Sequence, residues 1–144
     1  MMKENHIKLT KILTYSGTLP LIGSLLLTQF PLSVVDTKLV ASTYSAIIIS
    51  FLCGIHWAVY LFFAEECPSN LLLTSNAVAL LAWGSLLLEP QLLSKALQVF
   101  CFLSLLALDF KLCVAEILPE WFYSLRRNAT SIVVLCLSAM MILS

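Results

Sequence analysis

Residues 40–63 read V-A-S-T-Y-S-A-I-I-I-S-F-L-C-G-I-H-W-A-V-Y-L-F-F, an apolar run without Asp, Glu, Lys or Arg. About 20 apolar residues in a helix cross the hydrocarbon core of a bilayer, so this run predicts a transmembrane helix. Further apolar runs predict helices at about 12–30, 71–88, 96–114 and 128–144. We therefore expect an all-α fold, a polytopic transmembrane helical bundle of about five helices that forms a single integral membrane domain over residues 1–144.

The composition supports a membrane protein and excludes some functions. The chain is 60% hydrophobic and 11% charged, and a soluble domain usually has about 25% charged residues. The net charge is zero and no basic stripe alternates with aromatic residues, so we expect no nucleic-acid partner. The five cysteines form no C-x-x-C pair and are expected to act as small apolar residues. Neither a metal nor another cofactor is expected.

The first predicted helix, 12–30, follows three lysines and superficially resembles a secretory signal. It ends without a small-x-small cleavage pattern and is longer than the apolar core of most signals, so we expect it to be retained. Pro20 lies inside this helix and lacks a backbone N–H, which frees the carbonyl of Ser16. A bent first helix is therefore predicted.

The distribution of Lys and Arg predicts the orientation, because positive residues are retained on the cytoplasmic side of a membrane. With the amino terminus inside, the inner side holds Lys3, Lys8, Lys11, Lys111, Arg126 and Arg127, and the outer side holds Lys38 and Lys95. We therefore expect the N-terminus inside and the carboxyl terminus outside.

An interfacial segment is predicted at 116–127, between the last two helices. Pro119 is suited to open a short helix there, and the aromatic residues Trp121 and Phe122 precede Arg126 in the same stretch. The simplest interpretation is a membrane anchor at the level of the lipid headgroups. The alternative is a docking surface for anionic lipid or a partner protein, although two arginines are fewer than a lipid-binding cluster normally contains.

Small residues recur at every fourth position of the run 40–63. They are Ser42, Ala46, Ser50, Gly54 and Ala58. Such a small-xxx-small pattern lets helix backbones approach closely in lipid, so we expect helix packing along it. Because four residues turn a helix by about 40° more than a full circle, this stripe winds around the helix.

His56 and Asp109 are the candidate functional pair. His56 lies roughly 10 Å, and Asp109 roughly 8 Å, from the inner ends of their predicted helices, which makes a contact between them geometrically reasonable. A charged aspartate at mid-membrane costs roughly 2.5 to 3.5 kcal/mol, so it needs a partner or a water-filled recess. Two interpretations stay open: a structural hydrogen bond worth about 0.6 kcal/mol, and a working site.

Three parts of the sequence resemble a known family: 44–57, which contains F-L-C-G-I-H-W; Asp109; and 119–126, which reads P-E-W-F-Y-S-L-R. They resemble the family known as domain of unknown function 3429, which includes transmembrane protein 69 of animals. The motif positions outside the candidate pair are Trp57, Pro119, Trp121, Phe122, Leu125 and Arg126, whereas Cys53 and Ala58 stand where glycines are common. The resemblance implies a polytopic membrane protein and brings no established activity.

The resemblance also bears on location and function. The animal relative implies a mitochondrial setting for the eukaryotic branch, but this chain lacks a long Arg-rich presequence, so we expect a bacterial inner membrane. The sequence contains no H-E-x-x-H, G-x-S-x-G or glycine-rich phosphate loop, so we expect no enzyme. The leading hypothesis is an accessory, assembly or stability factor whose partners are the lipid bilayer and other membrane proteins or copies of itself. The alternative is a small oligomeric proton-linked or solute transport protein that uses His56 and Asp109.

Overall fold

The computed structural model describes residues 3–30, 34 and 36–143, and all regular elements among them are helices. They are α1 (Glu4–Ser16), α2 (Leu19–Leu27), α3 (Thr37–Phe63), α4 (Leu71–Ser85), α5 (Gln91–Val114) and α6 (Glu120–Leu143). By length and composition, α3, α5 and α6 can each cross a membrane, and α4 is a shorter apolar helix. The predicted all-α class is confirmed.

The first predicted helix is bent and consists of α1 and α2. The second piece begins next to Pro20, which has no N–H to continue the backbone hydrogen bonds of α1. At the bend, the carbonyl oxygen of Gly17 accepts a hydrogen bond from the hydroxyl of Tyr44 on α3 at 2.7 Å. The bend is therefore held against one of the long helices of the bundle.

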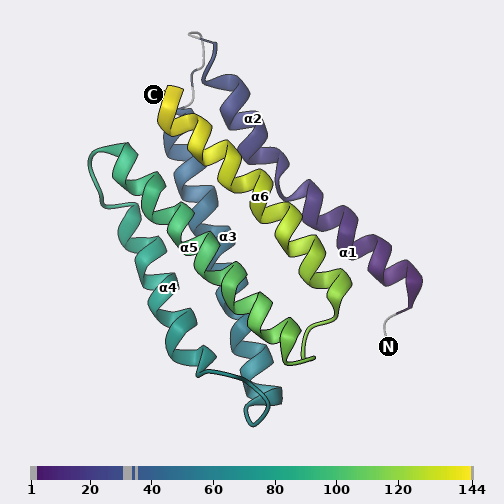
Figure 1. The fold of residues 1–144 in the computed structure, drawn as a ribbon. Coiled ribbons are helices and arrows are strands. Elements are labelled where there is room, and N and C mark those ends of the chain that lie inside the picture. Colours follow the sequence, from purple (N-terminus) through teal and green to yellow (C-terminus); the bar gives the residue numbers. More distant parts are fainter. Residues whose placement is uncertain (1–2, 31–33, 35, 144) are drawn as a thin grey trace.

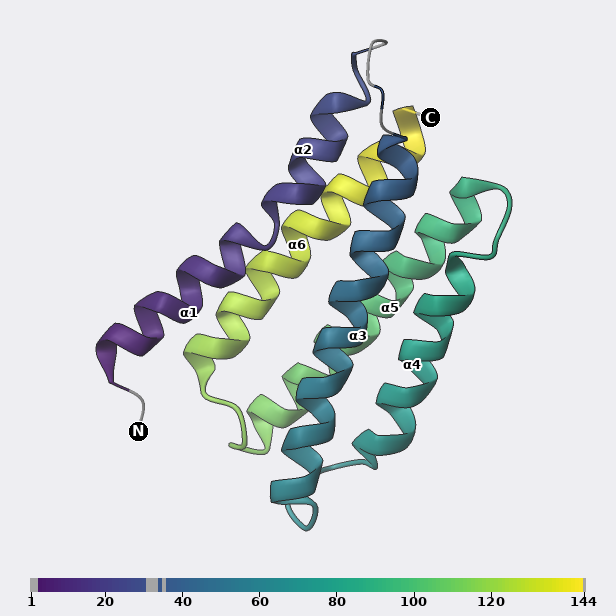
Figure 2. The ribbon, with the colours of Figure 1, turned by 180° about the vertical axis from the view of Figure 1, so that it is seen from behind.

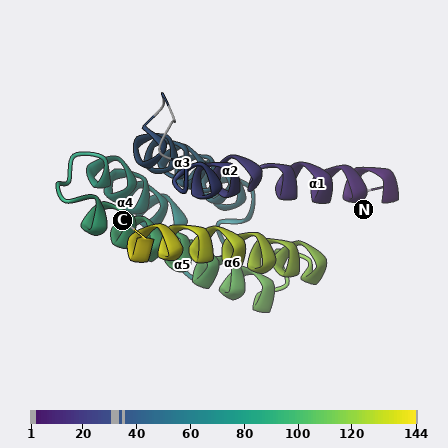
Figure 3. The ribbon, with the colours of Figure 1, turned by 90° about the horizontal axis from the view of Figure 1, so that it is seen from above.

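Helices α3 to α6 run up and down in sequence order and give the bundle two distinct ends (Figure 1). The amino terminus and the connections 64–70 and 115–119 lie at one end, and the connection 86–90 and the carboxyl terminus lie at the other (Figures 1 and 2). Helices α1 and α2 follow the length of α6, and α2 also packs on α3 (Figure 3). The inside placement of the amino terminus stays a prediction.

Several helix boundaries differ from the predicted ones because capping groups extend or end the helices. Helix α3 starts before the predicted residue 40, since the carboxylate of Asp36 accepts hydrogen bonds from the first free N–H groups. Helix α4 ends at Ser85 rather than 88, and α5 begins directly after Pro90 rather than at 96. Lys95, which was assigned to an outer loop, therefore belongs to α5, where its side chain is 1% exposed.

The predicted interfacial segment 116–127 is not a separate element. Glu116 adopts a positive φ of 60°, and the N–H groups of the next two residues bond to the carbonyl oxygen of Leu112. This capped reversal lets α6 begin at Glu120, eight residues before the predicted 128. The residues expected at the lipid headgroups therefore form the first turns of α6, and Arg126 is buried in the bundle.

The small-residue stripe on α3 packs within the chain over only part of its length. Ser42 and Ala46 are buried, whereas Ser50, Gly54 and Ala58 are exposed. The winding of a four-residue repeat explains the change, because four steps of about 40° carry the stripe to the opposite side of the helix. The buried face of α3 instead continues through Ile49, Leu52, Cys53 and His56, in which Ile49 lies three and four residues before Leu52 and Cys53, and His56 lies four and three residues after them.

Candidate functional site

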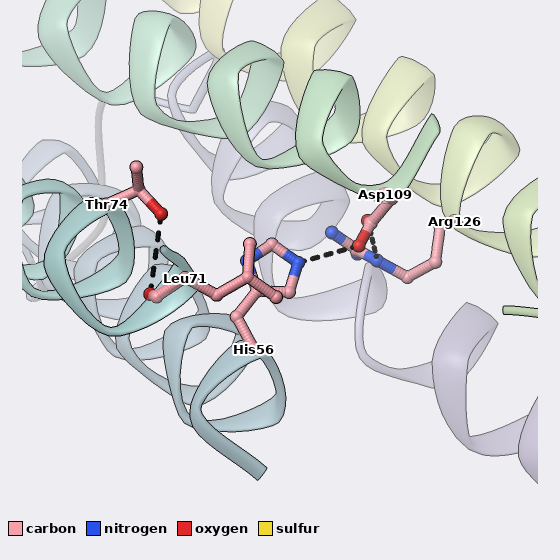
Figure 4. A network of polar contacts seen from close by, with 5 residues as sticks. All are labelled: His56, Leu71, Thr74, Asp109 and Arg126. Carbon is pink, nitrogen blue, oxygen red and sulfur yellow. Dashed lines mark hydrogen bonds and ion pairs between the residues drawn. The ribbon is translucent and has the colours of Figure 1, made fainter. Parts of the chain in front are cut away.

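The charged cluster, which consists of His56, Asp109 and Arg126, joins three helices. Asp109 on α5 uses both carboxylate oxygens (Figure 4). Nε2 of His56 on α3 lies 2.8 Å from Oδ1, and Nε of Arg126 on α6 donates to Oδ2 at 3.0 Å. The predicted contact between His56 and Asp109 is therefore present, and Arg126 adds an ion pair that the sequence analysis had not assigned to it.

The charges of the cluster balance one another. The guanidinium of Arg126 is permanently positive and compensates the carboxylate of Asp109, which can only accept hydrogen bonds. Nε2 of His56 therefore carries the hydrogen that it donates to Oδ1. With a neutral imidazole the net charge of the cluster is zero, and Nδ1 of His56 has no partner among the described residues.

Within the charged cluster, the pair of His56 and Asp109 is closed to water, whereas Arg126 also lines a neighbouring cavity. The side chains of His56 and Asp109 are each 3% exposed, and that of Arg126 is 9% exposed. The pocket that these three line together with Leu52, Ile55 and Phe122 has no volume that a water molecule could enter. In such an apolar setting each pairing is strong, and the loss of one partner is costly.

Local sequence and turn geometry bring the three side chains together. His56 continues the buried face of α3 from Leu52, and Asp109 lies one turn after the buried Leu105 on α5. The capped reversal at 115–119 then folds α6 back along α5, where Arg126 lies on a buried face with Ala129. The arrangement therefore depends on the turn as much as on the helices.

A second polar cluster, the amide cluster, lies toward the other end of α3 and α5. Its members are Ser42, Ser85, Gln91, Lys95 and Gln98. The amide nitrogen of Gln98 donates to the backbone oxygen of Ser42 at 2.9 Å and to the hydroxyl of Ser85 at 3.0 Å. Gln91 Oε1 accepts from Ser42 Oγ at 3.3 Å and from Lys95 Nζ at 3.2 Å. This cluster connects α3, α4 and α5.

Of the residues in the amide cluster, only Ser42 was a predicted site residue, as part of the small-residue stripe expected to pack against another helix. A signal was available on α5. Gln98 precedes Asp109 by eleven residues, which is close to three full turns, so both polar side chains share one face of an otherwise apolar helix. Polar residues aligned in this way inside a transmembrane helix indicate contacts with neighbouring helices.

Comparison with protein families gives a match over nearly the whole chain. The family model described as protein of unknown function (DUF3429) matches residues 7–142. The chain belongs to the DUF3429 family. The resemblance found in the sequence motifs is thereby confirmed. Neither the curated proteins nor the solved structures contain a match to the chain. With its apolar helices, this DUF3429 protein is an integral membrane protein of a family without an assigned function.

The motif residues of the DUF3429 chain divide between the core and the surface. Leu125 and Arg126 are buried, Trp121 and Phe122 are partly exposed and lie edge to face, and Pro119 and Trp57 are exposed. Arg126 is buried against Asp109, because α6 begins early enough to turn this side chain into the bundle, and its level relative to the lipid headgroups stays a prediction. The indole of Trp57 is exposed on the outer surface of the bundle and does not belong to the charged cluster.

The chemistry available to the DUF3429 site is limited. Within residues 3–30, 34 and 36–143, no three His, Cys, Asp or Glu side chains gather as metal ligands would. The five cysteines are free, and three of them are buried. The charged cluster can hold three helices together or transfer a proton at His56. Its closed geometry favours the first of these roles, since proton transfer needs a connection to water.

Proposed function

We propose that this DUF3429 protein is a non-enzymatic accessory factor that supports the assembly or stability of other membrane proteins. We further propose that it is a multi-pass protein of a bacterial inner membrane with its amino terminus in the cytoplasm. The charged cluster carries this proposal. Because His56, Asp109 and Arg126 pair with one another, the surface that remains for interaction is the outside of the bundle.

The same geometry gives little support to transport. Intramembrane ionisable residues that conduct ions or protons usually face a water-filled cavity. His56 and Asp109 instead lie in a pocket without room for water, and Arg126 balances the carboxylate. Alternating access at this site would also need a second copy of the bundle, because one bundle of this size does not supply two repeats.

The outer surface of α3 is compatible with a membrane partner. Ser50, Gly54 and Ala58 are exposed there, and a Cβ atom added to Gly54 would meet nothing within 4 Å. Small residues on a lipid-facing surface permit the close approach of another helix. The orientation is supported by the basic residues of α1 at the end of the bundle that also carries Lys111 and Arg127.

Quantitative affinity capture from membranes in a mild detergent tests the accessory role. We would compare wild type with Gly54→Leu, which adds a bulky side chain to the outer face of α3. Ala107→Leu is the matched control, because Ala107 is an exposed small residue on α5. Wild type and Ala107→Leu should retain the same membrane proteins in equal amounts, and Gly54→Leu should lose them while its thermal stability stays unchanged.

Two outcomes would contradict the proposal. One is recovery of the protein alone at several expression levels, with the same result for both variants. The other is proton flux into liposomes that contain the purified protein, between about pH 5 and 8, that is abolished by both His56→Gln and Asp109→Asn. The second outcome would establish the transport hypothesis instead.

A further inference from the structure

A cavity of about 370 Å³ lies between the bent pair α1 and α2 and the helices α3 and α6. Its size is within the roughly 300 to 1,000 Å³ that is typical of small-molecule sites in proteins. It adjoins the small pocket around the carboxylate of Asp109, and the two share Leu52, Ile55, Phe122 and Arg126 in their linings. The cavity therefore adjoins the charged cluster at Arg126.

Two residues of α6 that line this cavity each carry a buried polar group without a partner among the described residues. The groups are Nη2 of Arg126 and the hydroxyl of Thr130, and their residues are 8% and 2% exposed. Residues four apart lie on one face of a helix, so the two groups are neighbours. Nε of Arg126 is already bonded to Asp109. Nη2 thus requires an acceptor that the described residues do not supply.

The other polar groups around the cavity are already bonded. The hydroxyls of Thr10, Thr14 and Thr18 each donate to a backbone carbonyl of their own helical segment. The remainder of the lining is mostly apolar and includes Ile48 and Ile55 of α3. The cavity therefore combines a long apolar wall with one polar point on α6.

The cavity reaches the lipid-facing surface. Leu13 of α1 and Phe51 of α3 belong to its lining, and they are 62% and 67% exposed. In the views from both sides, α1 leaves the bundle beside α6 and lies away from α3 (Figures 1 and 2). A molecule dissolved in the bilayer could therefore enter between these two helices without crossing the water phase.

The charge of the site selects between possible headgroups. Asp109 already compensates the guanidinium of Arg126, so a second anion would be unbalanced in an apolar environment, where a lone charge is very unfavourable. An uncharged carbonyl oxygen offers the acceptor that Nη2 lacks and adds no charge. Thr130 can donate to the same oxygen through its hydroxyl.

We propose that this cavity binds an uncharged amphiphile from the bilayer, with its carbonyl oxygen at Arg126 and Thr130 and its hydrocarbon part toward Leu13 and Phe51. An acyl ester of a lipid and a membrane quinone share this chemistry. The site does not depend on the accessory role, because it rests on the cavity and its two polar groups alone.

Photolabelling of the full-length protein in nanodiscs tests the site. The probe is methyl palmitate with a diazirine on its chain, and labelled residues are identified by peptide mass spectrometry. Labelling should saturate and should concentrate on α1, α3 and α6 around the cavity. Unlabelled methyl palmitate or a decyl-substituted benzoquinone should compete, and the stronger competitor identifies the source of the carbonyl. Hexadecane and palmitate at alkaline pH should compete poorly.

Two variants assign the binding to the cavity. Thr130→Val removes one hydroxyl at nearly constant volume and should lower labelling about fivefold, as expected for one lost hydrogen bond. Thr14→Phe fills the cavity from α1 without changing α6 and should abolish saturable labelling. Thr43→Val is the control, because its hydroxyl bonds to its own helix outside the cavity. It should label like wild type.

Several results would overturn the proposal. They are labelling spread evenly over the lipid-facing helices, equal competition by hexadecane, stronger competition by the palmitate anion than by its ester, and wild-type labelling of Thr14→Phe. If Thr130→Val proves unstable, the comparison of Thr14→Phe with Thr43→Val decides alone, because neither change touches α6.

Discussion

The charged cluster and the amide cluster bury polar groups at opposite ends of the same helices, but they satisfy these groups differently. Asp109 holds His56 and Arg126 through charge, and both of its partners come from other helices. Gln98 holds α3 and α4 through neutral hydrogen bonds, one of them to a backbone oxygen. One cluster depends on matched charges and the other on the geometry of an amide group.

This difference has consequences for what each cluster tolerates. In an apolar environment, removal of one member of an ion pair leaves an uncompensated charge, whereas removal of a neutral hydrogen bond leaves only a polar group. Lys95 is an exception inside the amide cluster. Its buried ammonium donates a hydrogen bond to the neutral Gln91, and the ion pairs of the described residues include no carboxylate that contacts it.

Asp109→Leu should have the largest effect on the stability of the bundle. It leaves the guanidinium of Arg126 buried without a counter-charge, so we expect a loss of about 3 to 5 kcal/mol in the free energy of unfolding. Steric trapping in bicelles measures this quantity. Arg126→Leu should cost less than Asp109→Leu, because the remaining carboxylate of Asp109 keeps its hydrogen bond with Nε2 of His56.

The double variant Asp109→Leu/Arg126→Leu is the control for this effect. Because it removes both charges, it should be more stable than Asp109→Leu alone. His56→Gln should cost about 0.6 kcal/mol or less, since only one intramembrane hydrogen bond changes. A double variant that is no better than the sum of the single changes would show that the two charges do not act as a pair.

Much of the fold could be predicted because it depends on local patterns. The apolar runs indicated the helices of the bundle, and Pro20 indicated the bend between α1 and α2. Boundaries were less accurate, since Asp36 and the positive φ of Glu116 act through individual hydrogen bonds and turns that hydropathy does not report. The small-residue stripe packs within the chain only as far as Ala46, because the strict four-residue repeat rotates off the buried face, and packing along its exposed part stays a prediction.

One of the two contacts in the charged cluster could be predicted from the distance of each residue to the end of its helix. His56 and Asp109 lie at similar distances from the ends of their helices, and this agreement indicated the contact that the structure contains. Arg126 could not be assigned in the same way, because its position depends on where α6 begins after the reversal at 115–119. Lys95 was missed for a related reason, since α5 begins five residues earlier than predicted, whereas Gln98 lies inside the predicted helix and its contacts depend on the neighbouring helices α3 and α4.

Lys95→Met tests whether the amide cluster carries an unbalanced charge. Met replaces the ammonium by an apolar group of similar length, so we expect the variant to be more stable by about 1 to 2 kcal/mol. Lys38→Met is the matched control, because Lys38 is exposed in the first turn of α3, and its effect should stay within about 0.5 kcal/mol. Destabilisation by Lys95→Met in the same unfolding assay would show that the ammonium has a stronger partner than Gln91.

Gln98→Leu should have a smaller effect than Asp109→Leu, even though it breaks two hydrogen bonds. At about 0.6 kcal/mol for each intramembrane hydrogen bond, we expect a loss of about 1.2 kcal/mol, well below that of Asp109→Leu. Ser85→Ala removes the acceptor for Gln98 and also the hydrogen bond that the Ser85 hydroxyl donates to the backbone oxygen of Ala82 at 2.6 Å, so it should cost about as much as Gln98→Leu. In a double-mutant cycle, Gln98→Leu and Ser85→Ala together should cost about 0.6 kcal/mol less than the sum of the single changes, since the two changes share one hydrogen bond. A loss for Gln98→Leu as large as that for Asp109→Leu would remove the distinction between the two clusters, because it would mean that neutral amides hold this bundle as strongly as paired charges do.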